Sequence, residues 1–248
     1  MKINDLVTRN KYRNDIIFRI IDIIENKAIL KGEVVRLIAD STLEDLRLFS
    51  FEEKKTLTLP KIKEEKEVIK GTVLHIDGDE YYLKKAMDAY SKYNIEAVGY
   101  YIKEKEIPYK IENLLKKHRP DIVVITGHDA YYPSKNKNDI NAYKNSLYYV
   151  EAVKKCRELI PSKDELIIIS GACQSFYELL IKEGSNFASS PTRSNIHLLD
   201  PIIVASFIAN YRISQQIDIE YILSNTISKS MGGIESFGKA RKLFVGGK

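Results

Sequence analysis

The 248-residue sequence contains no tryptophan, only two cysteines and only four histidines. Two cysteines, Cys156 and Cys173, cannot build a disulfide framework or a zinc site made of thiolates alone. The histidines are scattered without metal-ligand spacing, and no glycine-rich loop has the strand-turn-helix setting of a nucleotide site. We therefore expect neither a metal nor another cofactor.

Long apolar runs are also missing. No run approaches the roughly 18 residues of a membrane span, and the first 15 residues lack the apolar core of a secretory signal. We expect no membrane span, and we expect the protein to stay in the compartment where it is made. The net charge of +5 is spread along the chain and forms no basic stripe with interleaved aromatic residues, so nucleic-acid binding is not predicted.

Three regions differ in composition. Residues 1–50 contain short β-branched runs, among them 16–23 and 34–38, and predict a small SH3-like β-barrel that binds or positions something. Residues 51–70 are dominated by lysine and glutamate and predict a charged linker. Residues 71–248 alternate apolar runs with amphipathic stretches and predict an α/β domain.

The α/β region predicts an open, mostly parallel sheet with helices on both faces. Its main strands are expected at 72–76, 97–102, 122–126 and 166–170, and its helices at 80–93, 107–115, 141–159 and 175–182. Ligands of such sheets bind at the carboxyl ends of the strands. The chemistry is therefore expected where these strands end.

Two of the expected strands end in the same way. Residues 121–130 read DIVVITGHDA and residues 165–175 read ELIIISGACQS, so each apolar run leads through a glycine to His128 or to Cys173. If the strands are neighbours, about 4.8 Å separates their backbones. The imidazole could then take the proton of the thiol and later protonate a leaving amine.

The setting of Cys173 also favours reactivity. A helix is expected directly after it, and a helix N-terminus together with a nearby histidine favours the thiolate. Cys156 instead falls inside a helical pattern and is interpreted as a packing residue. The pattern thus assigns the nucleophile to Cys173 and the general base to His128.

Two alternatives stay open. His197 follows the cysteine, the order seen in amidotransferase-like folds, so Cys173 with His197 would make a cysteine amidase or glutamine-amidotransferase-like enzyme. If His128 is the base, His197 is expected to line the substrate site. The second alternative is a non-enzymatic binding or scaffold module, in which the barrel carries the recognition.

The order of an apolar strand ending in histidine and a second ending in Ala-Cys resembles caspase–gingipain–legumain cysteine peptidases. The separation of 45 residues between His128 and Cys173 is close to the caspase spacing. A closer resemblance, to the YabG family of sporulation-specific proteases, covers nearly the whole chain. It rests on short motifs in a joint order: EVVRLIADS at 33–41, HIDGD at 75–79, GHDA at 127–130, GACQS at 171–175, NFASSP at 186–191 and NIH at 195–197.

This resemblance implies a caspase-like fold and a cysteine endopeptidase that trims spore-coat and morphogenetic proteins. It implies action in the mother-cell cytoplasm of a sporulating bacterium, at the forming spore coat. It carries the nucleophile onto Cys173 and the base onto His128, and it assigns the oxyanion hole to the backbone N–H groups of Cys173 and Asp129. Peptidases of the wider group have glycine in place of Asp129, whose carboxylate must point away or be paired.

The resemblance also implies a pocket for the substrate side chain before the cut, at the end of the first strand of the sheet. Asp77 and Asp79 occupy that place, so the pocket would bind arginine or lysine. The competing interpretation is that one of these carboxylates caps the following helix.

Overall fold

The computed structural model describes residues 1–50, 59–62, 69–212, 216–229 and 234–236. Its internal contacts divide the chain into two units, residues 1–59 and 60–248. The boundary between them falls inside the stretch 51–70, most of which lies outside the described residues. Each unit is treated by itself.

The N-terminal unit is an antiparallel sheet with the order β4-β3-β2-β1-β5. Its strands are β1 (Leu6–Arg9), β2 (Phe18–Ile24), β3 (Lys27–Gly32), β4 (Ile38–Thr42) and β5 (Leu46–Leu48), and short 3₁₀ turns follow β1 and β4. The buried side chains of the sheet form one small apolar core, made of Val7, Phe18, Ile20, Ala28, Leu30 and Leu46. Among the described strands, β4 and β5 are the two edge strands of the sheet and do not pair with each other. The closed SH3-like barrel stays a prediction.

The strand expected at 34–38 is wrong. Val34 and Val35 lie in the connection between β3 and β4, and β4 begins only at Ile38. The Leu37 N–H donates to the Val35 carbonyl, and the Gly32 N–H donates to the Leu37 carbonyl. These two bonds close a tight turn, which overrides the strand preference of the two valines.

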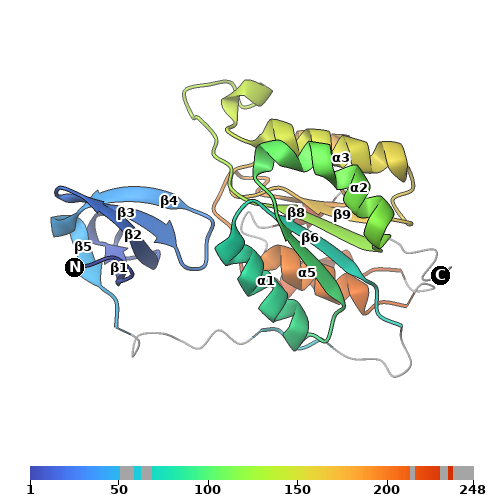
Figure 1. Cartoon of the computed structure of the whole chain (residues 1–248), viewed down its shortest axis with the longest axis horizontal. Helices are drawn as coiled ribbons and strands as arrows, with labels where there is room; N and C mark the ends of the chain where they lie inside the picture. The colour runs from blue at the N-terminus through green and yellow to red at the C-terminus, as the bar shows by residue number, and fades with distance from the viewer. Residues whose placement is uncertain (51–58, 63–68, 213–215, 230–233, 237–248) are drawn as a thin grey trace. The chain divides into compact units, whose positions relative to one another are not determined.

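The C-terminal unit contains a six-stranded sheet of order β11-β10-β9-β8-β6-β7 (Figure 1). Five strands are parallel and only β11 pairs antiparallel, which confirms a mostly parallel sheet. The strands are β6 (Val73–Asp77), β7 (Ala97–Tyr101), β8 (Ile122–Thr126), β9 (Ile167–Ser170), β10 (Phe187–Ser189) and β11 (Ile234–Ser236).

Helices cover both faces of this sheet, as expected. Figure 1 shows α2 (Ile107–His118) and α3 (Ser146–Leu159) on one face and α1 (Glu80–Lys92) and α5 (Asp200–Ala209) on the other. Two short helices, α4 (Tyr177–Lys182) and α6 (Ile219–Ser224), complete the unit. Within the described residues no helix is long and apolar enough to cross a membrane.

The core of the C-terminal unit explains why its strands read as continuous apolar runs. All five residues of β8 are buried, because helices pack on both faces of the strand. Alternate residues of the sheet, such as Leu74, Val123 and Ile168, join α2 and α3 in one apolar cluster. Each fully buried side chain of this kind contributes about 2 kcal/mol, so the sheet is a rigid base for the loops at its carboxyl edge.

Candidate active site

His128 and Cys173 follow the carboxyl ends of two paired strands of the sheet. In the parallel pair β8–β9, Ile122 lies opposite Ile167 and Ile125 opposite Ser170, an offset of 45 residues. The same offset separates His128 from Cys173, and each follows its strand end by two or three residues. The two strands are neighbours, which was the condition for the proposed pair of residues, and both candidate residues leave the same edge of the sheet.

The imidazole of His128 is held from two sides. Its Nε2 lies 3.0 Å from Oδ2 of Asp79, and the Tyr82 ring packs against it with 5.6 Å between ring centroids. The His128 backbone is also fixed, since its N–H donates to Oε1 of Glu104 at 2.8 Å and its carbonyl accepts from Asn145. The histidine is thus anchored through both its ring and its backbone.

Asp79 links that anchor to helix α1. Its Oδ1 accepts the N–H of Tyr81 at 3.0 Å and caps the helix, which confirms the capping interpretation. Its own N–H donates to Oδ1 of Asp77 at 2.9 Å. The loop after β6 therefore contacts His128 through the Asp79 carboxylate, which its bond to the first turn of α1 holds in place.

Asp77 belongs to a buried polar chain beneath this rim. Its Oδ2 accepts the Thr126 hydroxyl at 2.9 Å, and the same hydroxyl lies 3.1 Å from Nε2 of His75. Nδ1 of His75 lies 3.0 Å from the Tyr90 hydroxyl. His75 is completely buried and packs within the strand layer.

Cys173 lies in a tight turn between β9 and α4 and is buried. Its sulfur is 3.4 Å from the backbone nitrogen of Ile196, which donates to it. The turn begins at Gly171, whose φ of +99° requires glycine. The expected helix start directly after the cysteine is wrong, because α4 begins at Tyr177, four residues later.

Cys156 is the packing residue expected from the sequence. It is fully buried in α3, and burial raises the pKa of its thiol to about 12. A thiol in that state is a poor nucleophile near neutral pH. Cys173 is therefore the better candidate on chemical grounds.

Asp129 joins the two strand ends. Its carboxylate accepts four hydrogen bonds, from the N–H groups of Ala130 and Asn145 and from the hydroxyls of Ser146 and Ser175. Burial, offset in part by these bonds, raises the pKa of the Asp129 carboxyl. Its charge is compensated by donors, which answers the objection to an acidic residue at this place.

Sequence reasoning missed Ser146, Ser175 and Glu104. Ser175 stands inside the motif that contains the cysteine, and its position two residues beyond Cys173 was the available signal. Glu104 gave no signal, because it reaches His128 from the connection after β7. A Cβ on Gly78 or Gly127 would collide with the Glu104 carboxylate, so these glycines make room for it.

His197 lies next to Ile196, the residue that contacts the cysteine sulfur. Its Nδ1 accepts the N–H of Leu199 at 3.2 Å, and its own N–H donates to Ser228. One ring nitrogen of His197 thus takes part in the turn that leads into α5.

The motif at 186–191 is explained by structure. Oδ1 of Asn186 accepts the Ile168 N–H and a guanidinium N–H of Arg157, so this side chain connects β10 to β9 and α3. The Ser190 hydroxyl accepts the N–H of Gln174, the residue after the cysteine. This motif therefore stabilises both the strand before the cysteine turn and the turn itself.

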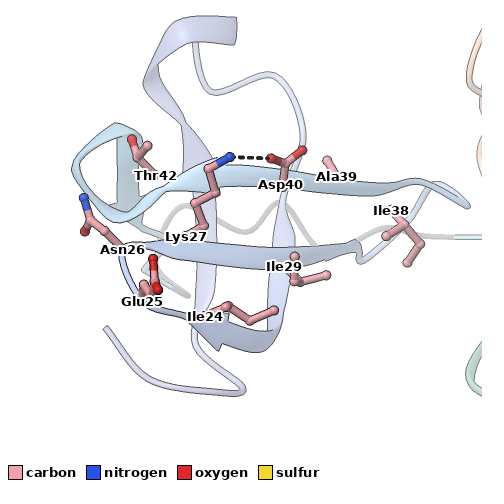
Figure 2. Close-up of a pocket in the computed structure, with 9 residues that line it drawn as sticks. All are labelled: Ile24, Glu25, Asn26, Lys27, Ile29, Ile38, Ala39, Asp40 and Thr42. Atoms are coloured by element: carbon pink, nitrogen blue, oxygen red, sulfur yellow. Dashed lines mark ion pairs between the residues drawn. The ribbon is translucent and has the colours of Figure 1, made fainter.

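Within the part of the chain that the structure describes, no group of histidine, cysteine and acidic side chains is arranged to hold a metal ion. A hollow of about 800 Å³ lies in the N-terminal unit, against β3 and β4 (Figure 2). It is lined by Ile24, Glu25, Asn26, Lys27, Ile29, Ile38, Ala39, Asp40 and Thr42, among which Lys27 and Asp40 form a 3.9 Å ion pair. None of these residues is a nucleophile candidate.

Comparison with known proteins defines the class. The family model described as YabG peptidase U57 matches residues 2–70 and 52–245. The chain belongs to this family of peptidases. It is also 39% identical over 279 aligned positions to the sporulation-specific protease YabG of Bacillus subtilis (strain 168), covering 97% of this chain and 96% of that protein.

Proposed function

We propose that the chain is a sporulation-specific cysteine endopeptidase with Cys173 as nucleophile and His128 as general base. The observation that carries this proposal is the pairing of β8 and β9, whose carboxyl ends lie side by side, two residues before His128 and three before Cys173. Membership of a peptidase family supplies the reaction class. Cys173, in the turn after β9, supplies the thiol, and the anchored His128 supplies the imidazole.

In this mechanism His128 takes the thiol proton, and the sulfur of Cys173 attacks the carbonyl carbon of the scissile peptide. The tetrahedral oxyanion accepts hydrogen bonds from the N–H groups of Cys173 and Asp129. His128 then gives its proton to the leaving amine, and the C–N bond breaks to leave a thioester. Water, deprotonated by His128, hydrolyses the thioester and restores the thiol.

The test is incubation of the purified full chain with a candidate spore-coat protein, followed by mass spectrometry of the fragments. Cys173→Ala and His128→Ala should each abolish cleavage, whereas Cys156→Ala and His118→Ala are matched controls that should retain it. Full activity of either site variant would refute the assignment. Loss of activity in His197→Ala with retention in His128→Ala would transfer the base to His197, and release of ammonia from small amides without protein cleavage would favour an amidase.

We propose that the acidic end of β6 makes the enzyme cleave after arginine or lysine. Asp79 brings a partly exposed carboxylate to the rim beside His128, and the buried Asp77 holds it there by accepting the Asp79 N–H. A guanidinium is the best partner for such a carboxylate. Asp77→Asn should raise KM for substrates with arginine before the cut by about tenfold, the effect of about 1.4 kcal/mol. A peptide scan without basic preference would contradict this pocket, in which His197 would form a further lining residue.

We also propose the substrates, the place of action and the fold of each unit. We propose that the substrates are spore-coat and morphogenetic proteins and that the place of action is the mother-cell cytoplasm at the forming coat. The name of the Bacillus subtilis relative, a sporulation-specific protease, supports action during sporulation. The C-terminal unit has a caspase-like fold, and the N-terminal sheet is an SH3-like barrel that binds or positions a partner. Unchanged coat processing in a Cys173→Ala strain would support a non-enzymatic scaffold role.

A further inference from the structure

Asp79 follows the end of a third strand of the same sheet, β6, which pairs with β8. In the parallel pair β6–β8, Val73 lies opposite Ile122 and Asp77 opposite Thr126, an offset of 49 residues. The same offset separates Asp79 from His128. Three neighbouring strands, β6, β8 and β9, therefore send a carboxylate, an imidazole and a thiol from one edge of the sheet, each two or three residues past its strand end.

The contact between Asp79 and His128 determines which ring nitrogen carries the proton. An ionised carboxylate only accepts hydrogen bonds. Since Oδ2 of Asp79 lies 3.0 Å from Nε2, the neutral ring donates from Nε2 and keeps its lone pair on Nδ1. That lone pair is what a general base needs for the thiol proton.

The carboxylate is itself fixed before any substrate binds. Its other oxygen accepts the Tyr81 N–H at the start of α1, and the Asp79 N–H is bound to Asp77. The Tyr82 ring, from the first turn of the same helix, packs on the imidazole. One helix start thus sets both the hydrogen bond and the ring plane of His128.

We propose that Asp79 is a positioning residue that holds His128 with Nε2 protonated and stabilises the imidazolium formed when Nδ1 takes the thiol proton. This inference rests on the proposed function and assigns the base atom within it. The proton on Nε2 stays in the bond to Asp79 throughout, and only the proton on Nδ1 moves, from sulfur to nitrogen and then to the leaving amine. The carboxylate acts through the histidine and does not touch the reacting atoms.

Two substitutions separate this role from helix capping. Asparagine and serine are both good N-caps, so Asp79→Asn and Asp79→Ser keep the bond to Tyr81. The Asp79→Asn amide can cap through its oxygen and present its NH₂ group to Nε2, which then has to accept and forces the ring proton onto Nδ1. Asp79→Ser caps but is too short to reach the ring.

The experiment measures kinetics and ring protonation together. In Asp79→Asn and Asp79→Ser we expect kcat to fall by about 10²-fold or more and the thermal midpoint to stay near that of the wild type, whereas loss of the acidic pocket alone would raise KM at constant kcat. Glu80→Gln, which removes a charge from the neighbouring exposed position, is the matched control and should leave kcat unchanged. Nitrogen NMR of ¹⁵N-histidine-labelled protein should show the Nε2–H form of His128 in the wild type and its loss in Asp79→Asn.

The outcomes distinguish this inference from the proposed function. If Cys173→Ala and His128→Ala are inactive while Asp79→Asn keeps kcat and the same ring form, the positioning role is refuted and the peptidase assignment stands. A rise in KM with unchanged kcat in Asp79→Asn would refute it as well, because Asp79 would then act on the substrate. If Cys173→Ala or His128→Ala is fully active, the proposed function fails whatever Asp79 does.

Discussion

The two strand ends that carry the candidate residues are stabilised by different chemistry. The end of β8 is held by carboxylates, since Asp79 binds the His128 ring and Glu104 binds its N–H. The turn after β9 is held by hydroxyl and backbone groups, among them Ser175, Ser190 and the N–H of Ile196. Two carboxylates thus lie where the proposed mechanism forms an imidazolium, whereas the proposed nucleophile accepts a hydrogen bond from a neutral backbone group, the Ile196 N–H.

Asp129 is where the two ends meet. Its carboxylate follows the histidine in the chain, but it accepts the hydroxyl of Ser175 beyond the cysteine and the hydroxyl of Ser146 at the start of α3. The buried carboxylate therefore fixes the spacing between the loops, while the reacting groups are oriented by other residues. Substitutions at the junction should affect both ends, and substitutions at one end should affect that end more.

The largest effect is expected from Asp129→Asn. All four partners of the carboxylate are donors, so the amide NH₂ group would face a donor and leave it unsatisfied. We expect a loss of about 3 kcal/mol in the free energy of unfolding and strongly reduced cleavage, measured by urea denaturation and by peptide hydrolysis. Asp139→Asn, at an exposed cap of a 3₁₀ turn, is the control and should cost a few tenths of that. Equal stability of the two variants would show that Asp129 does not join the ends.

The same variant gives a pH test. Burial is the largest cause that raises the pKa of Asp129, so the folded state holds its proton more tightly than the unfolded state does. The stability this group contributes is therefore complete below its unfolded pKa and is lost as the pH rises through the folded pKa. The stability difference between wild type and Asp129→Asn should be greater at acidic than at neutral pH. The opposite slope would mean that the four hydrogen bonds outweigh burial.

A smaller effect, concentrated on the histidine end, is expected from Gly127→Ala. The added Cβ would lie 2.6 Å from Oη of Tyr149 and 2.7 Å from Oε1 of Glu104, which bond to the carbonyl and the N–H of His128. We expect about 2 kcal/mol of destabilisation and a marked fall in kcat. In the control Gly99→Ala the new atom meets the flexible Met87 side chain, which can move away. Equal kcat in the two variants would contradict the backbone anchoring of His128.

The smallest effect is expected from Ser175→Ala, at the cysteine end. Its hydroxyl accepts the Ala172 N–H and donates to Asp129. Loss of both bonds should cost about 1–2 kcal/mol, and the rate of Cys173 alkylation by iodoacetamide should change less than the rate of peptide cleavage. Ser224→Ala, on an exposed helix, is the control for the loss of a hydroxyl. A larger loss of stability here than in Gly127→Ala would reverse the order of the two ends.

Much of the sheet could be predicted because burial on both faces leaves a clear pattern. β8 occupies the expected residues 122–126, and the repeated motif with its 45-residue spacing already matches the observed register. The prediction was wrong where local bonds decide, as at Val34 and Val35 in a turn, and at the start of α3, which begins at Ser146 instead of 141. Asp79 was predicted as a pocket residue or a cap, and its contact with His128 was not foreseen.

By itself, the amino-acid sequence determined the strand-helix alternation, the two similar strand ends and the packing role of Cys156, because these depend on apolar periodicity and on neighbours along the chain. Only the tertiary structure decided that β6, β8 and β9 are adjacent, that Asp79 contacts His128, and that Glu104, Ser146 and Ser175 support these strand ends. The reason is physical. Strand order and register are set by the packing of helices on both faces, and polar contacts between separate loops leave no periodic trace in a single chain.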